Sequence, residues 1–438
     1  MAESTENAVQ ECEPIVHQLK SFYSDRNASG MEATLDKMIE ESRASALRQD
    51  VLGTIDSINT LISILKVTET PAAKSERSSE VTLEAHEEGP IQSEKNFSVF
   101  SSEQQQRLVE KCFWTLVRLC RREMDKSTVN SSNIELIENQ LNFFEIFKLS
   151  ATRFVACAGI ALPAAWLVMI LASDSAERQF KLTAAGATQL IVDIINEHLG
   201  DDSVSEMACR AARNLAAGET DLVAKLVEDK VCKALVSVIR TQLRMPLIAN
   251  MVETSTVNED ANETVNGDAV AATEGVAGVE GVKEVDNLRP LVEGDQPINE
   301  AVCEAVLWAI VNLACDENVA TILGAEGGVE AVVDLSYKCR HNSSISLAAV
   351  SAIRNISSVG TLNYSLLART HVCHVLLMLI ENHRSDLDFV ETALWTITNL
   401  SCNAVLSNRL GSLGAANLIV DLYFRYTHTH TFVMLPST

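Results

Sequence analysis

The sequence predicts an all-α solenoid, a stack of helical repeats, and three observations lead to this fold class. Each of the four tryptophans stands in the same frame, in which a variable residue follows four positions later, then Leu, then a small residue. The frame recurs with a period of 43 or 44 residues. The apolar spacing within each copy is that of helices and not of alternating strands. A fixed period of this length predicts units of two or three helices that bury their apolar faces against their neighbours.

The variable residue of the frame gives the positions of the repeats. It falls at residues 118, 170, 214, 312, 355 and 399, so the steps are 52, 44, 98, 43 and 44 residues. The step of 98 contains one 44-residue repeat and an insertion, most of which is residues 251–295. That segment has eleven acids, two bases and no aromatic residue. Because it cannot bury enough apolar surface to offset its chain entropy, we expect a disordered acidic insertion.

Each repeat is expected to hold a short helix, a turn and two longer helices. Glycine recurs at the turn, as Gly186, as the pair Gly327-Gly328, and as Gly411 with Gly414. Glycine suits this position because it adopts a positive φ at little cost.

The sequence resembles the armadillo family in several short stretches. They are Ala-Xaa-Arg-Asn-Leu-Ala at 211–216, Trp-Ala-Ile-Val-Asn-Leu-Ala at 308–314, the glycine that follows, and Val-Val-Asp-Leu at 332–335. The resemblance covers residues 150–438 well and residues 100–150 poorly. It implies a right-handed α-solenoid of about six armadillo-like repeats that acts as a nonenzymatic scaffold or adaptor for other proteins.

The expected domain organisation follows from these patterns. An N-terminal helical region, a possible cap, is expected at 1–67, and its apolar stripe Val51, Ile55, Ile58, Ile62 and Leu65 predicts one helix for capping or for a coiled coil. The remaining segments are an acidic disordered linker at 68–98, armadillo-like repeats at 99–250 with the first ones degenerate, the acidic disordered insertion at 251–295, and further repeats at 296–438 with the last one incomplete. Either a noncanonical cap closes the last repeat or the sequence is truncated.

The cysteines and the apolar segments bear on the compartment. Eleven cysteines without a Cys-Xaa-Xaa-Cys pair favour a reducing compartment, so cytoplasmic or nuclear localisation is expected. Residues 154–173 are uncharged and long enough to span a membrane. However, Trp166 keeps the repeat phase there, and Gly159 and Pro163 suit a break between two buried helices. We therefore expect no membrane span.

The candidate binding site lies on the polar stripe that the tryptophans share with asparagines one turn later. Trp308 with Asn312 and Trp395 with Asn399 form complete pairs. The Asn carboxamide offers a donor and an acceptor to an extended peptide backbone, and the indole attracts Lys or Arg side chains. Alternatively, each Trp fills a groove between helices and each Asn bonds a neighbouring loop. The candidate peptide-binding groove comprises Glu304, Trp308, Asn312, Asn355, Glu391, Trp395, Asn399 and Asn214.

These pairs resemble the array of Trp and Asn four residues apart in importin-alpha, which recognises basic nuclear localisation segments. The resemblance implies an alternative function, a nuclear import adaptor for basic cargo. The departures are that Asn214 and Asn355 have Arg210 and Ser351 in place of Trp. Trp114 and Trp166 are followed by Arg118 and Ile170 in place of Asn, so we expect these two tryptophans only to pack. The basic amino-terminal segment of that family is also missing.

Other functional classes find little support. A third alternative, an armadillo-type regulator of a small GTPase, has no marker in the sequence. We expect no enzyme activity, no cofactor and no nucleic-acid partner, because no catalytic, phosphate-binding or basic aromatic motif occurs. His371, Cys373 and His374 have the types of a metal site, but surface histidines and a core cysteine are the preferred interpretation.

Net charge points to the nature of the partner. The chain carries −24, of which residues 1–100 and 251–295 carry −9 each. Most of the remaining acidity lies in residues 296–438, beside the two complete pairs. We therefore expect this region to bind a short basic or mixed extended protein segment weakly.

Overall fold

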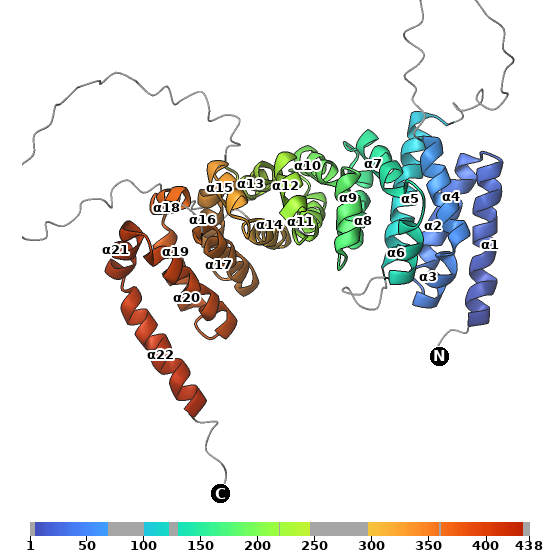
Figure 1. Cartoon of the computed structure of the whole chain (residues 1–438). Helices are drawn as coiled ribbons and strands as arrows, with labels where there is room; N and C mark the ends of the chain where they lie inside the picture. The colour runs from blue at the N-terminus through green and yellow to red at the C-terminus, as the bar shows by residue number, and fades with distance from the viewer. Residues whose placement is uncertain are drawn as a thin grey trace, which may run out of the picture. The chain divides into compact units, whose positions relative to one another are not determined.

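Helices are the regular elements of the computed structural model, which describes residues 5–68, 100–121, 130–218, 220–245, 297–358 and 361–431 (Figure 1). The all-α fold class is thus confirmed. The expected insertion at 251–295 lies outside the described residues, and so does the expected linker at 68–98 apart from its first residue, Thr68. Both remain predictions.

The predicted repeat unit is confirmed, with a short first helix (H1), a second helix (H2) and a third helix (H3) that carries the tryptophan frame. The H3 helices are α5 (Ser102–Cys120), α8 (Ala158–Leu171), α11 (Asp202–Ala216), α14 (Glu300–Leu313), α17 (Ser343–Ser357) and α20 (Leu387–Ser401). The H1 helices are α6 (Ser131–Glu138), α9 (Ala176–Ala184), α12 (Thr220–Glu228), α15 (Glu317–Ala325), α18 (Thr361–Ala368) and α21 (Ala404–Ser412). The H2 helices are α7 (Phe143–Arg153), α10 (Ala187–Glu197), α13 (Val231–Gln242), α16 (Gly328–Lys338), α19 (Val372–Asn382) and α22 (Ala415–Thr431). This order is that of armadillo-like repeats.

Five of the six turns between these H1 and H2 helices have the predicted backbone geometry, and the exception is the turn from α18 to α19, where His371 has a φ of −84°. Gly186, Gly327 and Gly414 each adopt a positive φ, of 87°, 77° and 84°. Asn142 and Lys230 occupy the corresponding turns with φ of 60° and 68°. The left-handed residue reverses the chain between two helices, which lets H2 pack back against H1.

Side-chain caps begin the later H3 helices. Asp201, Asn299, Asn342 and Asp386 each precede an H3 helix and accept hydrogen bonds from backbone N–H groups of its first turn. Such caps satisfy donors that a helix leaves unpaired at its start, and they fix where the H3 helix begins.

The N-terminal region continues the repeat pattern, which the sequence did not reveal. It comprises α1 (Thr5–Ser24), α2 (Ala28–Glu41), α3 (Ala46–Leu52) and α4 (Ile55–Thr68), and both α2 and α4 pack against α5. Gln49 of α3 donates to the Ser42 carbonyl at 3.0 Å, just as Gln179 of α9 donates to the Ala172 carbonyl at 3.0 Å. Helices α2, α3 and α4 therefore correspond to H3, H1 and H2.

The prediction that the apolar stripe of this region lies on one helix is wrong for its first residue, Val51. The chain breaks at Gly53 and Thr54, so Val51 lies on α3 while the rest of the stripe lies on α4. A Cβ atom on Gly53 would lie 2.3 Å from the Asn133 side chain, so only glycine fits. Thr54 then begins α4, and its hydroxyl accepts from the Ser57 N–H at 3.4 Å.

The uncharged segment at 154–173 is a turn followed by a buried H3 helix. The predicted break at Gly159 and Pro163 is wrong, because both residues lie inside α8 and the break comes before them. His198 holds that break by donating from its Nε2 to the Val155 carbonyl at 2.7 Å. No helix in the described part of the chain combines the length and apolar character needed to cross a membrane.

Helix α22 includes the Thr-His-Thr-His-Thr stretch at 427–431, because its backbone continues as helix to Thr431. Val420, Tyr423 and Phe424 of this helix are each more than half exposed.

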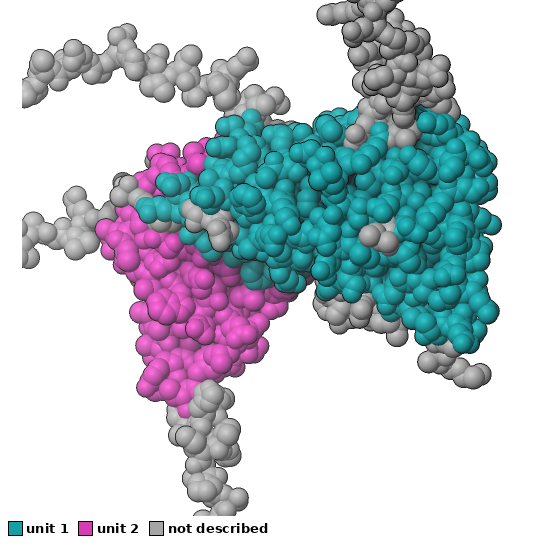
Figure 2. Space-filling view, turned by 45° about the vertical axis from the view of Figure 1, so that its right-hand side comes forward, with its two compact units in different colours: residues 1–238, 299–319 teal, residues 239–298, 320–438 magenta. Residues whose placement is uncertain are grey.

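The chain divides into two compact units (Figure 2). The first contains residues 1–238 and 299–319, and the second contains residues 239–298 and 320–438. In the first unit α5, α8, α11 and α14 pack side by side in that order. In the second, α17 packs against α20. Each unit thus presents neighbouring H3 helices, and the first unit holds Trp308 while the second holds Trp395.

Candidate functional site

Helix α14 carries its polar residues on one stripe. Glu300 is exposed, and Glu304, Trp308 and Asn312 are half-buried. The residues between them, from Val302 to Ile310, are otherwise apolar and buried. A helix repeats its direction about every 3.6 residues, so this stripe faces away from the core of its unit.

Helix α20 carries the same stripe in a more open setting. Glu391 and Asp388 are exposed, and 56% of Trp395 is accessible to solvent. Asn399 follows one turn later and is half-buried. A tryptophan this exposed gains little from packing in its own chain, which makes it available to a partner.

The asparagine of each pair binds to the preceding H3 helix. Asn312 Nδ2 donates to the Arg213 carbonyl at 3.0 Å, and Asn399 Nδ2 donates to the Arg354 carbonyl at 3.0 Å. Asn214, which lacks a tryptophan, does the same to the Met169 carbonyl at 2.8 Å. This recurring bond links successive H3 helices and uses one N–H of each carboxamide. The Oδ1 atom and the second N–H remain for a peptide backbone.

The two tryptophans differ in what covers them. The guanidinium carbon of Arg213 lies 5.3 Å from the centroid of the Trp308 ring, within the range of a cation–π interaction. Among the residues that the structure describes, no arginine lies over Trp395, although Arg354 occupies the position in α17 that Arg213 occupies in α11.

A thiol follows each complete pair by one turn. Cys315 and Cys402 come three residues after Asn312 and Asn399, and they are the two exposed cysteines among the eleven. Their Sγ atoms donate to the carbonyls of Val311 at 3.3 Å and Thr398 at 3.6 Å. The two thiols therefore lie at the carboxyl end of the polar stripes of α14 and α20.

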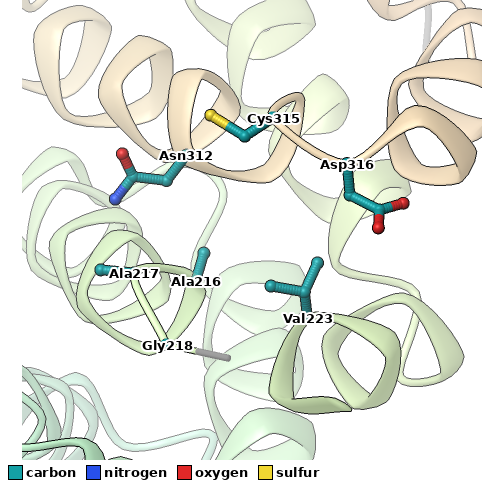
Figure 3. A pocket seen from close by; sticks show the side chains of 7 residues that line it. All are labelled: Ala216, Ala217, Gly218, Val223, Asn312, Cys315 and Asp316. Carbon is teal, nitrogen blue, oxygen red and sulfur yellow. The ribbon is translucent and has the colours of Figure 1, made fainter. Parts of the chain in front are cut away.

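A pocket of about 410 Å³ lies beside the first pair (Figure 3). Asn312 and Cys315 of the α14 segment face the end of α11 across it, while Asp316 and Val223 lie at its other side. Asp316 Oδ1 accepts from the N–H groups of Asn318 and Val319, so this carboxylate caps α15. The polar groups that line the pocket are thus one amide, one thiol and one carboxylate.

Tyr364 supports the second pair from α18. Its hydroxyl donates to the Asn399 carbonyl at 3.1 Å. Burial raises the pKa of the Tyr364 hydroxyl, and the nearby Cys402 thiol adds to that effect. The hydroxyl therefore stays protonated as a donor and positions the end of α20.

The predicted site residues divide between the two units. Asn214, Glu304, Trp308 and Asn312 belong to the first, and Asn355, Glu391, Trp395 and Asn399 belong to the second. Within α11, Arg210 takes the tryptophan position and forms an ion pair with Glu206 at 3.0 Å. In α17 the same position holds the buried Ser351, which offers no aromatic surface.

The two remaining tryptophans contact each other. The rings of Trp114 and Trp166 are 5.8 Å apart in an edge-to-face arrangement, and Arg121 lies over Trp166 at 5.0 Å. Both rings are half-buried. The geometry fits the packing role expected for them.

The candidate metal residues lie in different environments. Cys373 is buried, and burial raises its pKa to about 11, whereas His374 is exposed. His371 is half-buried at the start of α19. In the described residues no group of three or more His, Cys, Asp or Glu side chains is placed to hold a metal ion.

Sequence reasoning missed Arg213, Cys315, Cys402 and Tyr364. Two signals were present: an arginine directly precedes both Asn214 and Asn355, and a cysteine follows both complete pairs at the same distance. Neither signal shows by itself which tryptophan the arginine covers.

Comparison with known proteins found similarity to designed and engineered repeat proteins among solved structures, with TM-scores below 0.5. No family model matches the chain, and no curated protein sequence matches it. A designed armadillo repeat protein in complex with the peptide (KR)4 superposes with a TM-score of 0.47 at 16% identity, covering 79% of this chain and 99% of that one. A computationally designed armadillo repeat protein for modular peptide recognition gives 0.44 at 18% identity, covering 68% and 94%. An engineered protein gives 0.46 at 16% identity, covering 78% and 97%.

Proposed function

We propose that this protein is a nonenzymatic scaffold that binds an extended peptide segment, with a cationic side chain of that segment placed on Trp395. The observation that carries the proposal is the exposed stripe of α20, where Glu391, Trp395 and Asn399 follow one another at single turns and Trp395 is 56% exposed. The compartment we propose is the cytoplasm or the nucleus, because the eleven cysteines are free thiols.

Each residue of the stripe has a distinct part in recognition. The Trp395 ring attracts a Lys or Arg head group through its negative face. Glu391, exposed one turn earlier, adds a negative charge that favours the same head group. The Asn399 carboxamide keeps an acceptor and a second N–H for one peptide unit of the ligand, because among the described residues its one partner is the Arg354 carbonyl.

A peptide titration of the full chain tests this function. The probe is a fluorescently labelled eight-residue peptide of alternating Lys and Arg, with the same peptide built from Glu and Ser as the negative ligand. Trp395→Ala should weaken binding of the basic peptide by about ten-fold or more, as loss of an aromatic anchor does, and Asn399→Ala should weaken it less. Anisotropy gives both affinities.

Val420→Ala provides a matched control, because Val420 is also exposed and apolar but lies on α22 and outside the stripe. Its affinity for the peptide should equal that of the unmodified chain. Equal affinity in Trp395→Ala and Asn399→Ala as well would end the proposal.

A narrower candidate is a nuclear import adaptor for basic cargo, favoured by the two complete Trp/Asn pairs. Mass spectrometry of proteins bound by the full chain distinguishes it from a general scaffold. Recovery of karyopherins together with basic cargo supports the adaptor, and recovery of other protein partners alone supports the scaffold.

A further inference from the structure

The Trp308 site already holds a cation that comes from the chain itself. Arg213, at the end of α11, places its guanidinium carbon 5.3 Å from the Trp308 ring centroid. Its side chain is otherwise exposed, and the ring it covers lies one H3 helix further along the stack. A guanidinium over an indole face occupies the surface that a ligand cation would use.

The other member of the pair holds the backbone of the same arginine. Asn312 Nδ2 donates to the Arg213 carbonyl at 3.0 Å, so the pair fixes where the arginine side chain begins and also receives its head group. The Trp308 ring thus contacts the guanidinium of Arg213, and Asn312 binds the backbone of the same residue. In the proposed function, Trp395 and Asn399 make the same two kinds of contact with a residue of the partner.

We propose that Arg213 is an intramolecular occupant of the Trp308 site and determines its specificity, so that a cationic peptide must displace Arg213 before it can bind there. This inference rests on the proposed function for its binding consequence, but the contact itself can be tested without a ligand. A site that is open for only part of the time binds with an affinity reduced by its open fraction.

The second unit supplies the matched comparison. Arg354 precedes Asn355 as Arg213 precedes Asn214, and its carbonyl accepts from Asn399 at the same distance of 3.0 Å. In the described structure the Arg354 side chain lies over no aromatic ring. The presence of the arginine is therefore not sufficient for occupancy, and the two sites differ in the same chain.

The ligand-free test uses the four indole N–H resonances of the ¹⁵N-labelled full chain. Trp308→Phe assigns the Trp308 signal. Arg213→Met keeps an unbranched apolar stem and leaves the carbonyl that Asn312 binds, so folding should be unaffected. We expect the Trp308 resonance to shift in Arg213→Met and the Trp395 resonance to stay in place in Arg354→Met. An unshifted Trp308 resonance in Arg213→Met overturns the proposal.

The binding arm measures the basic eight-residue peptide on the Trp395→Ala background, where Trp308 is the remaining complete pair. Removing the occupant should raise affinity by about three- to six-fold, the reciprocal of the open fraction that an exposed cation–π contact leaves. Arg354→Met on the same background removes one charge elsewhere and should change affinity by less than about two-fold. A gain that disappears at high salt, or an equal gain in both variants, indicates charge repulsion alone and overturns the proposal.

The two arms separate failure of this inference from failure of the proposed function. If the Trp308 resonance shifts and no variant binds the basic peptide, the intramolecular contact is established and peptide binding is wrong. If the peptide binds at Trp395 and the resonance does not shift, peptide binding is established and the occupant is wrong.

Discussion

The pairs Trp308 with Asn312 and Trp395 with Asn399 share a sequence motif but have different surroundings. Both asparagines bind a carbonyl of the preceding H3 helix at 3.0 Å, and both pairs are followed by an exposed cysteine. The difference lies in one side chain of another repeat, because Arg213 covers the first tryptophan and no described arginine covers the second. A binding motif in a repeat protein is therefore only half of a site, and the adjacent repeat determines whether it is open.

The largest expected effect is on the alkylation rates of the two exposed cysteines, which follow the two Trp/Asn pairs. Cys315 and Cys402 should react with an alkylating reagent at least about 100-fold faster than the eight buried thiols, because a buried thiol reacts only after local opening. Burial also raises the pKa of Cys120 to about 12 and that of Cys373 to about 11, so these thiols stay protonated at pH 8.

Adding the basic peptide should slow alkylation of Cys402 more than that of Cys315, because the open pair fills first. Peptide mapping by mass spectrometry gives each rate, and the half-buried Cys157 serves as an internal reference. Equal protection of both cysteines would contradict the difference between the pairs.

The shared hydrogen bond should affect stability in both units, though not equally. Asn399→Ala removes a part-buried bond to the Arg354 carbonyl and should cost about 1 kcal/mol in the free energy of unfolding. Asn312→Ala removes an exposed bond to the Arg213 carbonyl, which water can replace, and should cost less. Urea denaturation followed by circular dichroism measures both. A larger loss of stability for Asn312→Ala than for Asn399→Ala would contradict this ranking of the two hydrogen bonds.

The smallest effect concerns the charge beside the open tryptophan. Glu391→Gln should lower affinity for the basic peptide by about two- to three-fold at low salt and leave it unchanged at 0.5 M salt, because exposed charge pairs are weak and screened. The Glu/Ser peptide is the control, and its affinity should not fall. Salt-independent loss would indicate that Glu391 makes a direct hydrogen bond and not a rim contact.

The repeat unit was predictable because its two sequence signals, the tryptophan frame and the turn glycine, each depend on a few neighbouring residues. The tryptophan frame located six H3 helices, and glycine located three of the H1–H2 turns, where Gly186, Gly327 and Gly414 adopt a positive φ. The N-terminal unit escaped detection because α2 lacks the frame, and it is recognised through the packing of α2 and α4 against α5 and the bond of Gln49 to the Ser42 carbonyl. Pro163 misled the prediction because the chain turns at residues 154–157, before α8 begins, and α8 continues through the proline.

For the candidate site, the sequence predicts how the residues of one helix are arranged on its surface, but not which residues of another helix contact them. The stripe of Trp308 and Asn312 follows from helical periodicity, whereas the position of Arg213 over Trp308 depends on how α11 packs against α14. Those residues are separated by a long insertion in the sequence. Helical periodicity describes the faces of one helix and does not show which residue of another helix contacts them.

The bond between Asn312 and the Arg213 carbonyl joins residues 99 apart in sequence, whereas the matching bond from Asn399 spans 45. The extra length enters the chain between α13 and α14, that is, between an H2 helix and the H3 helix that follows it. The entropy of closing a flexible connection grows only with the logarithm of its length, so a tenfold longer connection costs about 2 kcal/mol. Two H3 helices can therefore meet in the same register whether few or many residues separate them. The connection between an H2 and an H3 helix is therefore a position at which added residues need not disturb the pairing of the H3 helices on either side.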